Sequence, residues 1–420
     1  MTHLASRASD PAVRRLTVTL YGYAFLSDLV LLYPLYVVLF ADTGLSVGQI
    51  SSLFVLWSAA GIVFEVPSGA WADVVSRRLL LCIAPLVTGA GFALWVLVPS
   101  YPAFAVGFLL WGAGGALVSG ALEALVFTEL ERLDAADRYA RVLGRARTAG
   151  VLGVVVTGVL AGPVLAVGGY PAVGVATVVA CLLAAAVATR FPEHRTSTVA
   201  SDAPASGPDG DDDLGWWETM RAGVSQVRTH PPVRAAVLLV AVVAADWGAL
   251  DEFTPLLALD TGVGAKAVPL LLLLLWAGVT VGGLLAPAGE RLGTRGYAAL
   301  LALVAVALAG GALTGHPAGF VLIAVAFGAA QLATVLADAR LQARITGTSR
   351  ATVTSLAGMA TDALIIVTYA GYGLLATAAG NAVAFALTAG AYLVVALVLV
   401  TRRRPPAHLG SSPRSTGPGR

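Results

Sequence analysis

Residues 69–78 read GAWADVVSRR, and residues 286–295 read APAGERLGTR. Each stretch follows an apolar segment, and each places an acidic residue five positions before an arginine, as Asp73 precedes Arg78. A motif that recurs in equivalent loops indicates an internal duplication. The two stretches therefore predict a chain built from two related halves.

The composition predicts an integral membrane protein. Hydrophobic residues occupy 58% of the 420 positions and charged residues only 12%, so a water-soluble fold would lack polar surface. The net charge of +2 is too small to predict a nucleic-acid partner. A helix needs about 20 apolar residues to cross a hydrocarbon core about 30 Å thick. We predict an all-α integral membrane fold of 12 transmembrane helices in two six-helix bundles, at residues 17–40, 49–72, 79–98, 102–127, 147–168, 172–190, 233–258, 267–287, 297–314, 318–340, 351–375 and 379–401.

The basic residues fall on alternate loops of this arrangement, and Lys266 is the only cation assigned to the opposite side. By the positive-inside rule, both termini are cytoplasmic in a multi-pass protein of the cell (inner) membrane. The stretch SDAPASGPDGDDD at 201–213 cannot bury apolar area, whereas apolar residues recur at helical spacing over 214–230. The sequence thus predicts a cytoplasmic N-terminal tail (1–16), an N-terminal six-helix bundle (17–190), a cytoplasmic linker with an amphipathic helix (191–232), a C-terminal six-helix bundle (233–401) and a disordered cytoplasmic tail (402–420).

Three carboxylates lie close to the midpoints of the predicted first, seventh and eleventh helices: Asp28, Asp246 and Asp362. A charged side chain at the bilayer centre costs about 2.5–3.5 kcal/mol, so such residues usually face a protein-lined cavity. Secondary transporters bind substrates and coupling ions at this depth. We predict that these three carboxylates bind substrate or protons, because a carboxylate can carry a proton in one direction and a cation in the other.

Two further acids, Asp251 and Glu252, stand just before Pro255, where the predicted helix is expected to unwind near its outer end. Asp251 lies about 140° round the helix from Asp246, so the two carboxylates cannot face one point on a regular helix. For Asp251 and Glu252, gating at the outer mouth and contact with substrate are equally good interpretations. For aromatic residues nearby, packing or interfacial anchoring is the alternative to lining a cavity. The remaining candidates for the cavity lining are Tyr33, Trp247 and Gln331.

Three acids lie towards the predicted inner ends of helices. Glu65 is expected to pair with the arginines of the loop that follows it. Glu123 and Asp338 either belong to an inner gate or form structural salt bridges with neighbours such as Arg147 and Arg340.

With these features the chain resembles the major facilitator superfamily over essentially its whole length. Gly69, Asp73, Arg77 and Arg78 match the superfamily's inner-loop signature, with Ser76 where glycine is usual. The Asp73 carboxylate can accept hydrogen bonds from a helix N-terminus, and the arginines can pair with acids of the other half, so the loop would latch the outward-facing state. The alternative is a loop whose arginines only fix the topology. The candidates for the inner gate or latch are Glu65, Gly69, Asp73, Arg77, Arg78, Glu123, Glu290, Arg295 and Asp338.

The predicted fifth helix carries Gly158, Gly162 and Pro163, the core of a glycine/proline motif associated with drug-exporting antiporters of the superfamily. The match is partial, because Ala149 stands where the fuller motif has a glycine. An arginine common in the fourth helix of proton-coupled exporters would align near Phe108 and is absent. The glycines predict a smooth, kinked face that serves as a conformational pivot, and ordinary small-residue packing is the alternative.

Together these features predict a secondary active transporter that exports small amphipathic or cationic compounds by alternating access, in antiport with protons. The alternative is an importer of a small nutrient, such as a sugar or other organic solute. A non-transporting membrane sensor would leave the midplane carboxylates unexplained. We expect no enzyme activity, no cofactor and no metal site, and no GxxxxGK[ST] loop indicates ATP. The expected partners of a monomeric chain are a small-molecule substrate, protons and the lipid bilayer, without nucleic acid.

Overall fold

The computed structural model describes residues 11–194, 221, 224–345 and 350–401, with the backbone alone for residues 65–74 and 351. Within these ranges all regular secondary structure is helical, and eleven helical segments are long and apolar enough to cross a membrane. The all-α membrane fold expected from the sequence is thereby confirmed. The sequence predicts twelve transmembrane helices because it assigns two of them to one of these eleven segments.

That segment contains helix α7 (Tyr139–Ala188), which has 50 residues. At 1.5 Å per residue it would be about 75 Å long, more than twice the thickness of a hydrocarbon core. Gly169 has φ 64° and ψ −164°, a backbone conformation outside the helical region, and Pro171 follows it. Gly169 divides α7 into two arms, 139–168 and 170–188, which correspond to the predicted helices 147–168 and 172–190.

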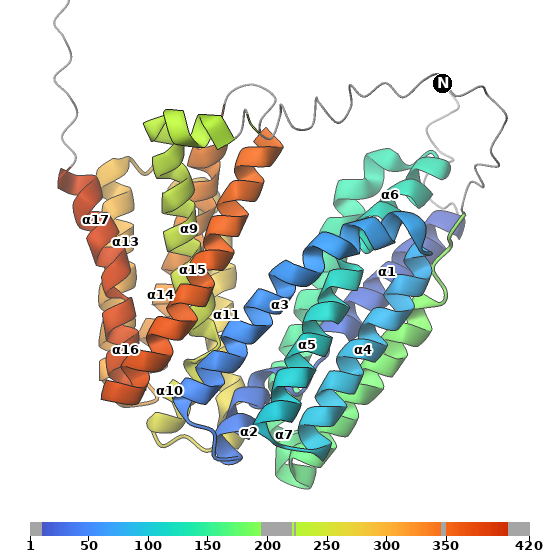
Figure 1. Ribbon diagram of the computed structural model, residues 1–420, viewed down its shortest axis with the longest axis horizontal. Coiled ribbons are helices and arrows are strands. Elements are labelled where there is room, and N and C mark those ends of the chain that lie inside the picture. Colours follow the sequence, from blue (N-terminus) through green and yellow to red (C-terminus); the bar gives the residue numbers. More distant parts are fainter. Residues whose placement is uncertain (1–10, 195–220, 222–223, 346–349, 402–420) are drawn as a thin grey trace, which may run out of the picture.

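The helices gather in two groups (Figure 1). In the N-terminal group α1 packs along α7, and α4 packs against both α5 and α7. In the C-terminal group α14 packs against α9, α11 and α13, and α15 packs against α9. Besides α7, the N-terminal group comprises α1 (Pro11–Asp28), η1 (Tyr33–Leu35), α2 (Tyr36–Asp42), α3 (Val47–Val74), α4 (Arg77–Leu97), α5 (Tyr101–Val118) and α6 (Ala121–Arg132). The C-terminal group comprises α9 (Pro231–Asp251), α10 (Thr254–Asp260), η3 (Ala265–Ala267), α11 (Val268–Leu284), α12 (Ala286–Gly289), α13 (Thr294–Leu313), α14 (Gly319–Gln342), α15 (Arg350–Ala379), α16 (Asn381–Thr388) and α17 (Gly390–Thr401).

The two ends of the molecule differ. We call the end where α1 begins, α7 ends and α9 begins the linker end, and the opposite end, where α3 and α11 begin, the closed end. The groups contact each other through α3 with α15, α7 with α11, and α2 with α10. Figure 1 shows that the groups converge at the closed end and lean apart towards the linker end.

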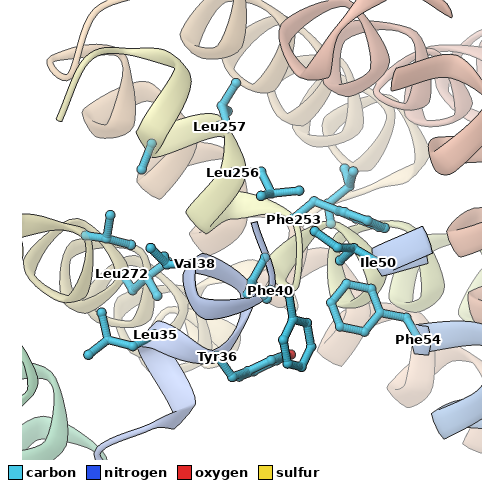
Figure 2. Close-up of a cluster of buried hydrophobic side chains, with 14 of the residues drawn as sticks. Leu35, Tyr36, Val38, Phe40, Ile50, Phe54, Phe253, Leu256, Leu257 and Leu272 are labelled. Atoms are coloured by element: carbon cyan, nitrogen blue, oxygen red, sulfur yellow. The ribbon is translucent and has the colours of Figure 1, made fainter. Parts of the chain in front are cut away.

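The apolar core follows the same division. One cluster of buried side chains contains residues of both groups and fills the closed end. Figure 2 shows part of it, with Tyr36, Phe40 and Phe54 of the N-terminal group beside Phe253 and Leu256 of the C-terminal group. Two other clusters each belong to one group. Burial of apolar side chains therefore joins the groups at the closed end, while each group keeps a core of its own nearer the linker end.

Several predicted helices are interrupted. Between α1 and α2 the chain unwinds over residues 29–32 before η1, and it unwinds again at residues 252–253 between α9 and α10. Pro34 and Pro255 lie beside these breaks, and proline cannot donate the backbone hydrogen bond that would continue a helix. Asp28 is consequently the last residue of α1, so the predicted first helix is not continuous, although Asp28 lies near the middle of the membrane span Pro11–Asp42. The unwinding expected before Pro255 is present.

Some predicted boundaries shift or fall outside the description. Helix α1 begins at Pro11, so residues 11–16 are helical rather than part of a tail. The helix expected over 102–127 is divided at residues 119–120, where Gly120 has φ 73°. Much of the predicted amphipathic helix at 214–230, and the whole tail at 402–420, lie outside the described residues.

Candidate functional site

The site begins with a cavity of about 480 Å³ between the two groups. Helices α3 and α5 supply one side of it, and α9 and α15 supply the other. Two carboxylates from the C-terminal group, Glu252 and Asp362, lie in its lining, opposite the indole rings of Trp57 and Trp111. A transport pathway between two bundles would need residues of both bundles around one space, and this cavity has them.

A second cavity of about 550 Å³ adjoins the first and shares Trp57 and Trp111 with it. Its lining comes from α1, the break after α1, η1, α3, α4, α5 and α7 of the N-terminal group and from α11 of the C-terminal group. Among the described residues Asp28 is the one carboxylate of this lining, and the hydroxyls of Ser27, Thr88, Thr157 and Thr280 supply most of its remaining polar groups. The break after α1 thus places Asp28 at a cavity wall.

Aromatic rings line the boundary of the two cavities. The Trp57 and Trp111 rings are stacked with centroids 4.9 Å apart, and Trp111 also stacks on Phe108. The Tyr33 ring lies 6.0 Å from Trp111 and 5.9 Å from Trp276 of the C-terminal group. Tyr33, predicted as a cavity residue, therefore lines the second cavity and contacts both groups.

At the closed end a hydrogen bond joins the two groups. The Tyr36 hydroxyl donates to the Glu252 carboxylate, and both side chains are buried, with Glu252 8% exposed. Tyr33 is also within hydrogen-bonding reach of Glu252. Glu252 lies in the break between α9 and α10, and Tyr36 is the first residue of α2, shortly after the break that follows α1.

Asp251, the neighbour of Glu252, faces Trp276, which is within hydrogen-bonding reach of its carboxylate. Its Oδ1 atom is buried, and no group among the described residues donates to that atom. Asp251 does not line either cavity described above. Of the two acids predicted near the outer mouth, Glu252 therefore has contact with both the cavity and the other group.

The predicted pivot glycines of α7 lie against α11 and against η3, the short helix that precedes it. A Cβ atom on Gly158 would overlap the Leu273 side chain, and one on Gly162 would overlap the backbone oxygen of Lys266. Both glycines therefore permit a close approach of the two groups. Within α7, Pro163 follows Gly162 directly. This geometry favours a role of the two glycines in contact between the groups rather than in packing inside one bundle.

The third predicted midplane acid, Asp246, lies inside the C-terminal group. It is 6% exposed, and its Oδ2 atom has no hydrogen-bond donor among the described residues. The next residue, Trp247, donates from its ring nitrogen to Thr334 at 3.2 Å and from its backbone to the Tyr392 hydroxyl at 3.0 Å. Asp246, Trp247 and Gln331 are absent from the linings of the two central cavities.

At the linker end, the first inner-gate residues lie on α3. Glu65, Gly69 and Asp73 belong to this helix, and their side chains lie outside the described part of the chain. Arg77 donates from its side chain to the Thr128 hydroxyl at 3.1 Å and from its backbone to Glu193 at 2.7 Å. These contacts of Arg77 lie within the N-terminal group rather than across the two groups.

The remaining inner-gate candidates are dispersed. Glu123 forms a salt bridge with Arg147 at 3.8 Å, between α6 and α7, as the structural alternative predicts. Arg340 donates to the Leu292 backbone oxygen and lies over the Tyr297 ring instead of pairing with Asp338. Glu290, Arg295 and Asp338 have exposed side chains.

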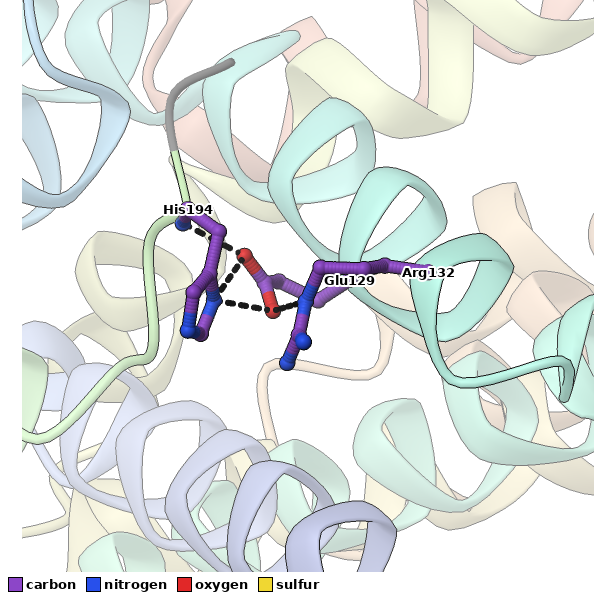
Figure 3. Close-up of polar contacts among 3 residues, drawn as sticks. All are labelled: Glu129, Arg132 and His194. Atoms are coloured by element: carbon purple, nitrogen blue, oxygen red, sulfur yellow. Dashed lines mark hydrogen bonds and ion pairs between the residues drawn. The ribbon is translucent and has the colours of Figure 1, made fainter.

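Sequence reasoning missed a polar cluster at the root of the linker. Figure 3 shows Glu129 of α6 between His194 and Arg132. The Glu129 carboxylate, 3% exposed, accepts hydrogen bonds from the His194 backbone at 2.8 Å and from the Arg132 side chain at 3.2 Å, and it lies 3.0 Å from the His194 ring. Glu193, the residue before His194, accepts a hydrogen bond from Ser76, which also caps α4. In the sequence, the signal for this cluster was Glu129, a glutamate among apolar residues of α6.

The comparisons with known proteins agree with this architecture. The solved nucleoside transporter NupG is 13% identical, with a TM-score of 0.69 over 93% of this chain and 98% of its own. A bacterial homologue of the human lysosomal transporter Spinster, in an inward-facing and unoccupied conformation, is 17% identical, with a TM-score of 0.67 over 93% and 95% of the two chains. The D-xylose–proton symporter is 15% identical, with a TM-score of 0.64 over 94% and 98%.

At these identities the solved structures establish the fold alone. None of the curated proteins compared with this sequence matches it. The sequence model of the Major Facilitator Superfamily, however, matches residues 18–295, which is more than half of the chain. In the described part of the chain eleven helical segments could cross a membrane, and two groups of helices enclose a central cavity. Together with this match they lead to one conclusion: the chain is a multi-pass membrane protein of the major facilitator superfamily, whose members are transporters.

Proposed function

We propose that the protein exports small amphipathic or cationic compounds by alternating access, in antiport with protons. The observation that carries this proposal is the character of the two central cavities. Among the described residues, their linings contain the carboxylates of Asp28, Glu252 and Asp362 and a row of aromatic rings, and they contain no lysine, arginine or histidine. Carboxylates beside aromatic faces attract organic cations, both by charge and by cation–π attraction.

The antiport follows from the same carboxylates. A carboxylate that binds a proton in one conformation no longer attracts a cation, so proton entry and cation exit can alternate at one group. Asp28 and Asp362, one from each group, are the candidates for this exchange. Asp246 remains a candidate for proton binding inside the C-terminal group, because its buried carboxylate lies near Tyr392.

The conformation is proposed to be inward-facing. If the basic loops are cytoplasmic, the linker end faces the cytoplasm of the cell (inner) membrane and the closed end faces outwards. The proposed bundles, 17–190 and 233–401, then meet at the outer side through Tyr36 and Glu252. In the outward-facing state Asp73, Arg77 and Arg78 would latch the cytoplasmic side, and the α7 glycines would act as the pivot.

The export is tested with cells that express the protein and with a fluorescent lipophilic cation such as ethidium. We expect expression to lower ethidium accumulation, an uncoupler to restore it, and Asp362→Asn to abolish the difference while insertion into the membrane is unchanged. The matched control is Asp137→Asn, which changes an exposed aspartate at the linker end. A rise in accumulation with expression would reverse the direction and refute export.

One observation favours the second candidate, an importer of a small nutrient. The solved structures with the same fold include a nucleoside transporter and a D-xylose–proton symporter. Serine and threonine hydroxyls in the second cavity could hydrogen-bond a sugar. The import hypothesis is tested with proteoliposomes that are loaded at alkaline pH and given labelled D-xylose or uridine outside. If the protein is an importer, the proton gradient should drive uptake of the label, and if it is an exporter of cations, no such uptake is expected.

A further inference from the structure

The backbone at the end of α1 is held against helix α7. The Thr157 hydroxyl donates a hydrogen bond to the Asp28 backbone oxygen at 3.3 Å. Gly153, one turn earlier in α7, allows a close approach of the same chain, because a Cβ atom there would overlap the Phe25 backbone oxygen. These two residues of α7 therefore fix the backbone position of Asp28, and the orientation of its side chain is what remains to be set.

A third residue of α7, Gly150, lies against the Asp28 carboxylate. Positions 150, 153 and 157 share one face of the helix, because they are three and seven residues apart. A Cβ atom on Gly150 would overlap the Asp28 Oδ2 atom. The carboxylate thus occupies the space that a side chain at position 150 would fill.

The two glycines differ in what would have to move if a side chain were added. At Gly153 the added atom would meet the backbone of α1, which can yield only if the helix shifts. At Gly150 it would meet the far end of the Asp28 side chain, and beyond that side chain the nearest atom is the Ala24 backbone oxygen at 3.8 Å, an ordinary contact. A side chain can turn about its own bonds far more easily than a helix can move. Alanine at position 150 should therefore turn the carboxylate and leave the fold intact.

The orientation of this carboxylate decides where a cation can bind in the second cavity. Val151 and Val154 of α7 also line this cavity, so Asp28 stands beside an apolar stretch of its wall. In such surroundings a single charged group sets the position of a bound cation. A carboxylate that is already oriented also binds more tightly, because less conformational freedom is lost on binding.

From this geometry we propose that Gly150 is a positioning residue of the cation site. Because it has no side chain, it gives the Asp28 carboxylate its place in the second cavity, and it acts on the substrate only through Asp28. This inference rests on the proposed function and deepens it, because it assigns cation binding to the second cavity and names the residue that orients the charged group there.

The first test compares two alanine substitutions in α7. Binding of ethidium to the full-length protein in lipid nanodiscs is measured by fluorescence, and the unfolding midpoint of each variant is measured beside it. We expect Gly150→Ala to weaken ethidium binding about tenfold, the loss of one contact with a charged group, at an unchanged midpoint. Gly144→Ala adds a Cβ atom that has no atom within 4 Å and should change neither quantity. Gly153→Ala should lower the midpoint, because its Cβ atom meets backbone.

The second test asks whether Gly150 acts through Asp28. Asp28→Asn keeps the size of the side chain and removes its charge, so it should weaken ethidium binding by itself. Gly150→Ala in the Asp28→Asn background should then cause no further loss, because the charge that it would displace is absent. Residues that act independently would instead lower the affinity by the product of their separate effects. A structural role of Gly150 would not produce this dependence on Asp28.

The possible results separate the inference from the proposed function. Unchanged binding in Gly150→Ala, additive losses in the double variant, or a Gly150→Ala protein that unfolds as readily as Gly153→Ala would each overturn the positioning role. Ethidium binding and export that survive Asp28→Asn would overturn it too, and they would leave export standing with another carboxylate as its site. If the unaltered protein neither binds nor exports ethidium, both the inference and the proposed function are refuted.

Discussion

At the residue scale, the structure distinguishes acids that the sequence treats alike. Asp28 and Asp362 line cavities, Glu252 lines a cavity and bonds to the other group, and Asp246 is buried within one group. All four lie within apolar segments, and periodicity cannot decide which helix face meets a cavity once the helices are interrupted. The break after Asp28 and the break at Glu252 are what turn these carboxylates towards the centre.

The hydrogen bond between Tyr36 and Glu252 gives a first prediction. Tyr36→Phe removes a hydroxyl donor from a buried carboxylate, which typically costs about 1–3 kcal/mol. We expect weaker contact at the closed end, hence a lower midpoint of thermal unfolding and a lower transport rate. The matched control is Tyr101→Phe, because the Tyr101 hydroxyl bonds to Ser52 at an exposed position. Equal midpoints for the two variants would contradict a role of this bond in joining the groups.

At the element scale, helix breaks and close helix contacts organise the molecule. Helix α7 approaches α11 at Gly158 and η3 at Gly162, where it carries no side chain. Helix α3 approaches α15 where Gly373 meets Ser51. A bulkier residue at these points would meet backbone or a neighbouring side chain. Small residues at helix interfaces let two helices pack closely. Close packing matters in membranes because the hydrophobic effect does not hold helices together there.

Gly162→Ala tests the contact between α7 and η3, the short helix directly before α11. The added Cβ would meet the Lys266 backbone oxygen, so the helices must shift, and such overpacking usually costs about 1–3 kcal/mol. We expect a lower unfolding midpoint and slower transport. Gly144→Ala, in the same helix, adds a Cβ that meets nothing within 4 Å and should leave both unchanged. If the two variants behave alike, the α7 glycine is not needed for contact between the groups.

The cluster at the root of the linker gives a further prediction. Glu129→Gln replaces a buried carboxylate, which accepts hydrogen bonds from His194 and Arg132, with a neutral amide. Hydrogen bonds to charged groups of this kind contribute about 1.5–3 kcal/mol. We expect faster proteolysis at the segment that follows α7, measured by limited trypsin digestion. Glu131→Gln changes an exposed neighbour in the same helix and should not alter the digestion rate. Protection of the segment in both variants would refute the anchoring role.

At the scale of the whole molecule, the groups share a core at the closed end and have separate cores nearer the linker end. Under the proposed alternating access, this arrangement is one of two conformations. The same groups would have to lose the closed-end contacts and gain contacts at the linker end to complete a transport cycle. The Arg77 side chain becomes available for that second arrangement when its hydrogen bond to Thr128 breaks, because Glu193 contacts only the Arg77 backbone.

This state predicts one-sided access to the central cavity. Ser119 lines the first cavity, so a cysteine introduced there should react with a membrane-impermeant maleimide only from the cytoplasmic side. The experiment uses Ser119→Cys in a variant whose native Cys82 and Cys181 are replaced by alanine. We expect fast labelling of inside-out vesicles and slow labelling of intact cells. Faster labelling of intact cells would show that the resting state opens outwards.

The sequence alone determined the membrane class, the all-helical fold, the superfamily and the presence of costly acids in apolar segments. Those properties follow from composition, segment length and local motifs, which need no knowledge of distant contacts. Only the tertiary structure decided that Asp28 and Asp362 line adjoining cavities, that Tyr36 meets Glu252, and that Asp246 stays inside one bundle. The reason is physical: which acids face a common space depends on where helices break and how two bundles pack, and contacts between residues far apart in the chain fix both.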